Sequence, residues 1–345
     1  MQLTRDQVFD LYRRLLGREP ECDQVVELHL ARRQDFWDLL EDVTHSDEFR
    51  ARAGRLSAHS LLKAQNTNYL ARGLSEETRF GCMLYNYASL QRMLAPSCLV
   101  HLLKHGLPIL TEDSNDAGVR VDLSAFGGPP DEGELSLVVS RDGVSLALLT
   151  FSIVPPRDFG VEGTTGFFVS RLQGSLGAGT VVREITRALG DISLPYLLMA
   201  VLEGVASAHG ADCIIGVDAR SQPFFKPEYE HLFLRHYDDL FASLGAARLP
   251  SGFHLLTLPF KRRALAEMDA HRRARTRAKR AIKLRLMEGA RLCWSSYLQP
   301  TRPVADIVRK PVSGPSGHGW PARLHAIRSH MHGGFARLAA VTGAR

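Results

Sequence analysis

The chain has 345 residues, and 45% of them are hydrophobic, which is enough for one full core and a smaller attached unit. Its five cysteines are odd in number, far apart and without a C-x-x-C pair, so the pattern indicates neither a disulfide framework nor a thiolate zinc site. No long apolar stretch lacks a charge, and the N-terminus carries both signs of charge, unlike a secretion signal. We therefore expect a folded cytoplasmic protein, with peripheral contact to the inner membrane as an open alternative.

The first segment, residues 1–55, is predicted to be a small helical domain. Apolar residues recur at helical spacing in VFDLYRRLL, Thr4 precedes them as a helix cap, and Gly17 is placed to end the helix. The stretches YRRLLGREP and SDEF resemble a short helical domain, over residues 1–52, that is found in bacterial proteins of cell-surface and glycoconjugate systems. The alternative is a helical bundle that only packs on the main domain. Residues 56–110 continue with apolar spacing of three and four, which predicts a helical lead-in.

Residues 111–295 are predicted to form an α+β domain on a mixed β-sheet. Two β-prone runs flank the tripeptide RDG at 141–143, which indicates a hairpin. The strand GFFVSRLQG, a glycine-rich turn, two helices and the buried strand CIIGVDA follow, and this order predicts a parallel pair of strands with a helical crossover. A short helix and a second hairpin come next. We expect residues 296–345, which are rich in Pro and Gly, to form a flexible tail.

The order of these elements is similar to the Gcn5-related N-acetyltransferase fold. In that fold the turn after the third strand of this series places backbone N–H groups on the pyrophosphate of acyl-CoA, so the resemblance implies acyl-CoA as a cosubstrate and no covalently bound cofactor. Here Leu176 stands where that family has a small residue, and a second helix precedes the parallel strand, so a purely structural turn is the alternative. The residues that the resemblance assigns to the cosubstrate are Arg171, Gln173, Gly174, Ser175, Gly177, Gly179 and Arg183.

A succession of whole segments over residues 60–290 resembles the VirK/YbjX family. These segments are NTNYL, GELSLVV, LLTFSI, SRLQG, VVREITRALG, LPYLLMAVLEGVASAHG, IIGVDA, HYDDLFASLGA and RRARTRAKRA. The family consists of bacterial proteins of uncharacterised biochemistry, some of them linked to virulence and to tolerance of cationic antimicrobial peptides. The chain departs from the family after IIGV, where Asp218, Arg220, Ser221 and Gln222 replace a stretch that usually contains Asn and His.

The residues available for catalysis are few, because the motifs of zinc proteases, serine hydrolases, P-loop enzymes and kinases are all absent from the sequence. An acetyltransferase-like reaction needs a base for the amine and an acid for the departing thiolate. The resemblance assigns the acid to Tyr237, with Tyr229 as a second choice, and a core tyrosine is the alternative for Tyr237. The candidate bases are Asp218 at the end of the parallel strand, Glu162 before the preceding strand, and His236. Asp218 is favoured because of its place at the strand end, with a helix cap or a salt bridge to Arg220 as the alternative. No metal site is predicted.

The net charge of +6 is concentrated in residues 261–291, where twelve Lys or Arg stand against three Asp or Glu. This segment is predicted to form one or two cationic helices, and it could bind tRNA, anionic lipid or nothing specific. Two functions follow from the whole sequence. One is an acyl- or aminoacyl-transferase that uses acyl-CoA or aminoacyl-tRNA to modify a small amine or peptide. The other is a non-catalytic accessory protein that binds an envelope component or an anionic membrane surface.

Overall fold

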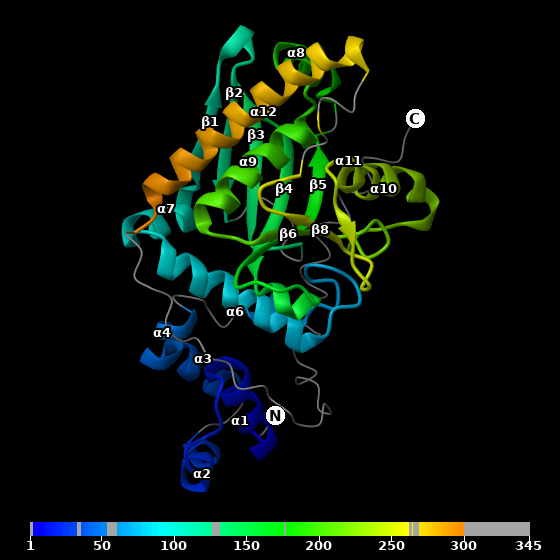
Figure 1. Cartoon of the computed structure of the whole chain (residues 1–345). Helices are drawn as coiled ribbons and strands as arrows, with labels where there is room; N and C mark the ends of the chain where they lie inside the picture. Colours follow the sequence, from blue (N-terminus) through cyan, green and yellow to red (C-terminus); the bar gives the residue numbers. More distant parts are fainter. Residues whose placement is uncertain are drawn as a thin grey trace. The chain divides into compact units, whose positions relative to one another are not determined.

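The computed structural model describes residues 3–32, 36–53, 61–125, 132–175, 177–261, 264 and 269–299. All of them belong to one compact unit, Met1–Pro303 (Figure 1). Most of the predicted tail, residues 300–345, lies outside the described residues, as does Leu176 in the glycine-rich turn.

The N-terminal segment is helical, as the apolar spacing predicts. Thr4 caps the first helix through a capping box with Gln7, and Gly17, with a φ of 71°, ends the following π-helical turn. That turn and helix α4 pack against helix α6, which in turn contacts strand β4. The elements are α1 (Arg5–Leu11), η1 (Tyr12–Leu16), α2 (Asp23–Arg32), α3 (Phe36–His45), α4 (Asp47–Ala53) and α6 (Glu76–Met93).

The helical lead-in predicted for residues 56–110 is only partly correct. Helices α6 and α7 (Pro96–His105) are present, but residues 66–75 form turns, preceded by the short 3₁₀ helix Leu62–Gln65. Helix α7 ends at Gly106, whose φ is 81°, and the segment LPILTE after it is strand β1 (Leu107–Glu112). Pairing with a neighbouring strand overrides the helical spacing of this segment.

In the described part of the chain, eight strands form one mixed sheet in the order β1-β2-β3-β4-β5-β6-β8-β7. Neighbouring strands of this sheet run antiparallel except β5 and β6, which pair in parallel across the predicted helical crossover. The α+β class, the hairpin at residues 141–143 and the parallel pair are confirmed. Besides β1 the strands are β2 (Val119–Ser124), β3 (Leu135–Arg141), β4 (Val144–Val154), β5 (Gly166–Gly174), β6 (Cys213–Gly216), β7 (Ala247–Arg248) and β8 (His254–Thr257).

Two long helices cover the sheet. Helix α9 (Leu194–His209) contacts β3, β4 and β5, and α12 (Ala270–Tyr297) lies along α9 and reaches β1 (Figure 1). The two helices approach so closely that a Cβ on Gly204 would stand 2.1 Å from the carbonyl oxygen of Met287. From Ala270 onward the basic segment is part of one helix, α12, and the C-terminal half of α12 belongs to the core, with Leu286, Ala290 and Trp294 buried. None of the described helices is long and apolar enough to cross a membrane.

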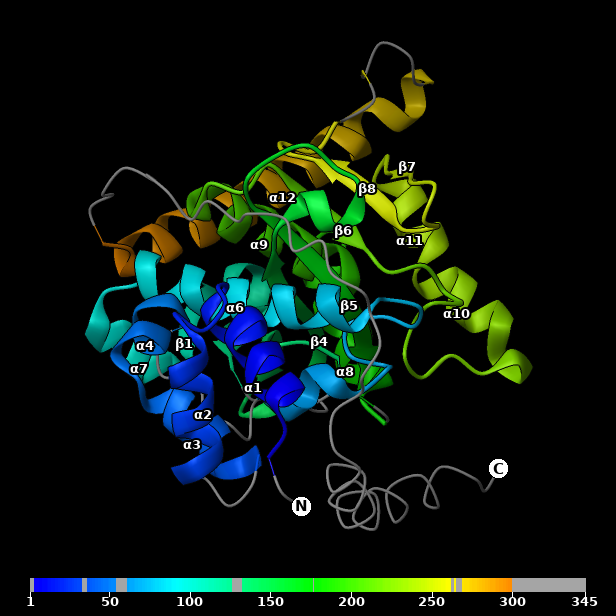
Figure 2. The ribbon, with the colours of Figure 1, turned by 90° about the horizontal axis from the view of Figure 1, so that it is seen from below.

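The remaining helices lie at the ends of the parallel strands. Helix α8 (Gly179–Ala188) follows β5, and α10 (Glu230–His236) and α11 (Asp238–Ser243) follow β6. Helix α10 has no buried residue and stands out beside the β7 and β8 edge of the sheet (Figure 2).

Candidate functional site

The parallel strands β5 and β6 separate after four residue pairs. Their pairing ends at Val169 and Gly216, and the next residue of β5, Ser170, is a β-bulge against β4. A bulge bends its strand and increases the local twist, so the continuing backbone of β5 turns away from β6. Ligand sites in sheets of this kind lie where parallel strands end and diverge.

Tyr237 fills the space that opens between these strands. Its hydroxyl accepts a hydrogen bond of 3.3 Å from the backbone N–H of Leu172, two residues beyond the bulge. The side chain is buried and stacks on Phe233. Burial raises the pKa of the Tyr237 hydroxyl, against the opposing effect of the Leu172 N–H, so the phenol is protonated at neutral pH.

Several polar side chains that are largely buried lie around Tyr237. Glu132 is 1% exposed and forms an ion pair with Arg171 on β5, and the other oxygen of its carboxylate accepts a hydrogen bond of 3.0 Å from the Gln222 amide. Gln222 also accepts the N–H of Phe224 at 2.6 Å, and its amide acts to lower the pKa of Tyr237. Arg171 therefore has its charge compensated by Glu132.

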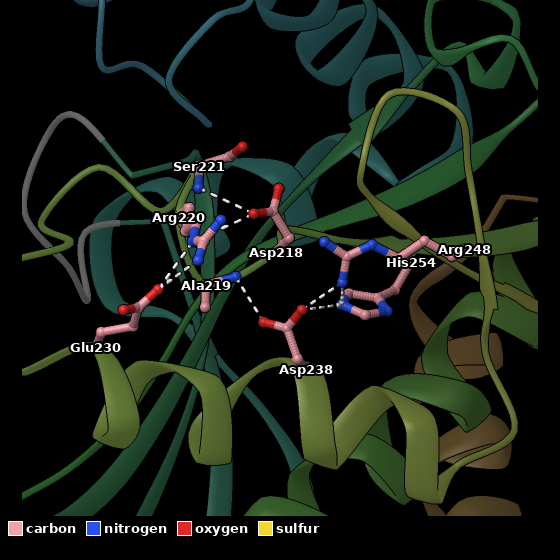
Figure 3. Close-up of polar contacts among 8 residues, drawn as sticks. All are labelled: Asp218, Ala219, Arg220, Ser221, Glu230, Asp238, Arg248 and His254. Carbon is pink, nitrogen blue, oxygen red and sulfur yellow. Dashed lines mark hydrogen bonds and ion pairs between the residues drawn. The ribbon is translucent and has the colours of Figure 1, made fainter. Parts of the chain in front are cut away.

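Asp218 is 5% exposed. It lies two residues after the end of β6 (Figure 3). Its Oδ1 accepts the backbone N–H groups of Arg220 and Ser221, at 3.0 and 3.2 Å, so the carboxylate organises the turn that follows the strand. Its Oδ2 faces the turn between β7 and β8 at Gly252. The Arg220 side chain bonds to Glu230 instead, at 2.8 Å. Asp218 thus caps this turn, and no salt bridge to Arg220 is formed.

A second carboxylate, Asp238, joins this turn to the sheet edge. Its Oδ2 accepts the N–H of Ala219 at 2.8 Å, while its Oδ1 contacts Arg248 of β7 and lies 3.3 Å from Nε2 of His254 on β8 (Figure 3). Burial opposes ionisation of Asp238, but the bonds from Arg248 and Ala219 outweigh it and lower its pKa. Burial also lowers the pKa of His254, although Asp238 acts in the opposite direction. His254 is therefore a neutral imidazole at neutral pH.

The loop after Asp218 is fixed by hydrogen bonds from the segment NTNYLAR, residues 66–72. Arg72 donates from its backbone to the carbonyl of Ser221 at 2.8 Å and from its guanidinium to those of Pro223 and Phe225 at 2.8 and 3.1 Å. Tyr69 is fully buried and donates to the buried carboxylate of Glu134 at 2.8 Å. Two sequence segments that are far apart thus meet beside the diverging strands.

The structure brings some of the predicted site residues together and separates others. Asp218 and Tyr237 lie at the carboxyl end of the parallel pair, linked through the bond from Ala219 to Asp238. Glu162 is exposed in the loop before β5, at the opposite end of that strand, so the structure does not bring it together with Asp218 and Tyr237.

The glycine-rich turn lies at the exposed end of β5. Gln173, Gly174, Ser175, Gly177 and Gly179 are all exposed, and a Cβ added at Gly177 or Gly179 would meet no atom within 4 Å. Gly177 has a φ of 79°, which requires glycine, whereas Gly179 begins α8 with an ordinary backbone. Arg183 is exposed on α8 and bonds Thr180 at 3.4 Å.

Four residues of the site were missed by reasoning from the sequence: Glu132, Asp238, Arg248 and His254. Asp238 was the one most accessible to prediction, because it follows Tyr237 directly and a search for titratable residues around the candidate acid would have included it. The other three are brought in by strand pairing and by the loop before β3, which no local pattern indicates. Within the described ranges, no group of three or more His, Cys, Asp and Glu could hold a metal ion.

These features define an α+β protein with a polar site at the end of its parallel strands, and comparison with known families agrees with the sequence resemblance. A family model described as a protein of unknown function, DUF535, matches residues 30–285. The chain belongs to this family, which is commonly called VirK/YbjX. No curated protein and no solved structure matches the chain.

Proposed function

We propose that the chain is an acyltransferase with an acetyltransferase-like fold, which transfers an acyl or aminoacyl group from acyl-CoA or aminoacyl-tRNA to an amine or peptide. The observation that carries this proposal is the coincidence of three features on β5. The bulge at Ser170 lies where the parallel pairing ends. The Leu172 amide, which no longer faces β6, donates a hydrogen bond to the Tyr237 hydroxyl, and the glycine-rich turn follows at the end of the same strand. The strand order, with one parallel pair flanked by antiparallel strands, supports the same class.

The reaction requires one bond to form and one to break. The nitrogen of the acceptor amine attacks the carbonyl carbon of the donor, a C–N bond forms, and the C–S bond of a thioester or the C–O bond of an aminoacyl ester breaks. In the proposal the Asp218 carboxylate takes the proton from the amine, and the Tyr237 hydroxyl gives its proton to the departing sulfur or oxygen. Burial of Tyr237 keeps its proton in place until the leaving group carries negative charge.

In this proposal the glycine-rich turn is the binding site for the phosphate groups of the acyl donor. The open space around Gly177 and Gly179 lets a phosphate approach the backbone, and the N-terminus of α8 contributes unpaired N–H groups, since no side chain caps it. Arg183 is the nearest exposed cation of the proposed set, whereas Arg171 is neutralised by Glu132 and supports the site from within.

The second candidate is the non-catalytic accessory protein that binds an envelope component or a membrane surface. It is favoured by the side chains that already fill the space between the strands, because Tyr237 bonds to the Leu172 amide and Gln222 bonds to Glu132. It is also favoured by four exposed large apolar side chains in the segment that follows Asp218: Phe224, Tyr229, Leu232 and Leu234.

Two measurements on the purified 345-residue chain, ligand stabilisation and group transfer, distinguish the acyltransferase from the accessory protein. We expect acetyl-CoA, longer acyl-CoAs or charged tRNA to raise its melting temperature, and mass spectrometry to detect transfer to a mixture of amines and peptides. Tyr237→Phe should abolish transfer while keeping binding, and Tyr229→Phe is the matched control, since Tyr229 is an exposed tyrosine of the same segment. Absence of both stabilisation and transfer with every donor would reject the enzyme and leave the accessory role.

A further inference from the structure

The exposed half of α12 carries a row of arginines. Arg273, Arg277 and Arg280 follow one another at spacings of four and three residues, which places them on one face of the helix. Arg273 and Arg277 are exposed and Arg280 is half-buried. We call these three residues the arginine row.

Several cations of this half of α12, Arg273 and Arg280 among them, interact with other residues of the chain. Arg275 forms an ion pair of 2.6 Å with Asp191, and Lys279 donates to the Asp191 carbonyl at 3.0 Å. Asp191 lies just after α8, and a Cβ on Gly190 would stand 2.9 Å from Ile282, so the end of α8 and this half of α12 are in contact. The first turns of α12 nevertheless extend beyond the sheet (Figure 2).

The side chains between these cations are too small to enter a lipid bilayer. From Arg273 to Ala281 the residues other than Arg and Lys are Ala and Thr, and Leu284, which is 49% exposed, follows on the same face. One large apolar side chain does not make the apolar face that an interfacial helix needs. The same stretch has no aromatic side chain on which unpaired bases could stack. Guanidinium groups repeated along one helix face are instead suited to the phosphates of a double-stranded nucleic acid, which they bind in a bidentate manner.

We infer that the arginine row binds the phosphate backbone of a double-stranded RNA stem, and that the donor of the proposed transferase is an acyl ester carried at the end of that RNA. The second half of this inference rests on the proposed function. Helix α8 supplies the geometric link, because its ten residues span about 15 Å between the glycine-rich turn and its contact with α12. A stem bound along the arginine row would thus lie one short helix away from the turn.

The test measures binding of uncharged tRNA by fluorescence anisotropy at several KCl concentrations. The variant Arg273→Gln, Arg277→Gln, Arg280→Gln keeps helix propensity and removes three charges. We expect it to weaken binding and to reduce the slope of log affinity against log salt by about three, one for each lost phosphate contact. The control variant Arg50→Gln, Lys104→Gln, Arg157→Gln removes three exposed charges from other elements and should leave the slope unchanged.

Circular dichroism and melting temperature confirm that both variants fold. Equal slopes for wild type and both variants would overturn the inference, and so would binding to phosphatidylglycerol vesicles without binding to tRNA. Stronger binding to duplex DNA of equal length than to tRNA would overturn it as well. If tRNA binding depends on the arginine row but no donor supports transfer, the arginine row is an RNA-binding surface and the proposed transferase function is rejected.

Discussion

The hydroxyl of Tyr237 and the backbone N–H of Leu172 form a hydrogen bond of 3.3 Å between residues 65 positions apart. The amide of Leu172 belongs to the part of β5 that has turned away from β6 after the bulge at Ser170, and it has no strand partner on that side. Tyr237, at the junction of α10 and α11, supplies the acceptor that a continuing β6 would have provided. The Tyr237 phenol therefore has two roles. It accepts the hydrogen bond of an otherwise unpaired strand amide, and it is the acid of the proposed site.

The substitution Tyr237→Phe measures the structural role of the hydroxyl, which is its hydrogen bond with the Leu172 amide, separately from its role in transfer. The ring and its stacking on Phe233 are kept, while the buried N–H of Leu172 loses its acceptor, so we expect a loss of about 1–3 kcal/mol in unfolding free energy. Urea unfolding measures this loss. Tyr229→Phe should change stability by less than about 0.5 kcal/mol, because Tyr229 is 50% exposed. Equal stability of Tyr237→Phe and wild type would show that the Leu172 amide finds another acceptor.

The glycine-rich turn allows a matched pair of substitutions. Gly177→Ala forces a residue with a Cβ into a φ of 79° and should cost about 1–2 kcal/mol. Gly179→Ala meets no neighbouring atom and no backbone strain, so the folded protein should be as stable as wild type or slightly more stable. Thermal unfolding measures both effects.

The ligand response of Gly179→Ala tests the proposed phosphate site directly. If phosphates approach this turn, the added methyl group should weaken stabilisation by the acyl donor although the protein itself is intact. A donor response identical to that of wild type would exclude close approach of a ligand at Gly179.

Asp238→Asn should disturb both sides of the site. The change removes the charge that faces Arg248 and His254 and replaces an acceptor by a donor, so we expect a loss of about 1–3 kcal/mol. Since Asp238 raises the pKa of His254, its loss should lower that pKa further, which NMR titration of the imidazole detects. Asp239→Asn is the neighbouring exposed control. An unchanged His254 titration in Asp238→Asn would contradict the contact.

His209 predicts a dependence of stability on pH. It is buried between α6 and α12, bonds Ser89 at 2.8 Å, and burial together with the charge of Arg92 lowers its pKa to about 4. The unfolded chain, with a histidine pKa of about 6.5, binds a proton that the folded protein rejects, so stability falls as pH drops from about 6.5 to about 4.

The expected loss through His209 is about 2–3 kcal/mol between pH 7.5 and pH 4.5. His209→Gln removes the titrating group, so its urea midpoint should decline less than that of wild type over this range. Parallel declines in the two proteins would show that His209 is protonated in the folded state.

Several elements follow from local chemistry alone. The cap at Thr4, the end of η1 at Gly17, the hairpin at residues 141–143 and the helix Leu194–His209 are each set by residues within a few positions, and all four are present in the structure. The segment LPILTE shows the limit of such patterns. Its apolar spacing suits a helix, but Gly106 stops α7 and pairing with β2 makes it a strand.

The family, the α+β class and the parallel pair were predictable from the order of residues, because periodicity and turn chemistry act over short distances. The site was not predictable in this way, because its contacts arise from the folding of distant segments onto one another. Strand pairing brings Arg248 and His254 to Asp238, the bulge at Ser170 frees the amide that Tyr237 occupies, and the loop before β3 delivers Glu132 to Arg171. These contacts join residues with no common local pattern, so packing of the whole sheet is the physical cause that selects them.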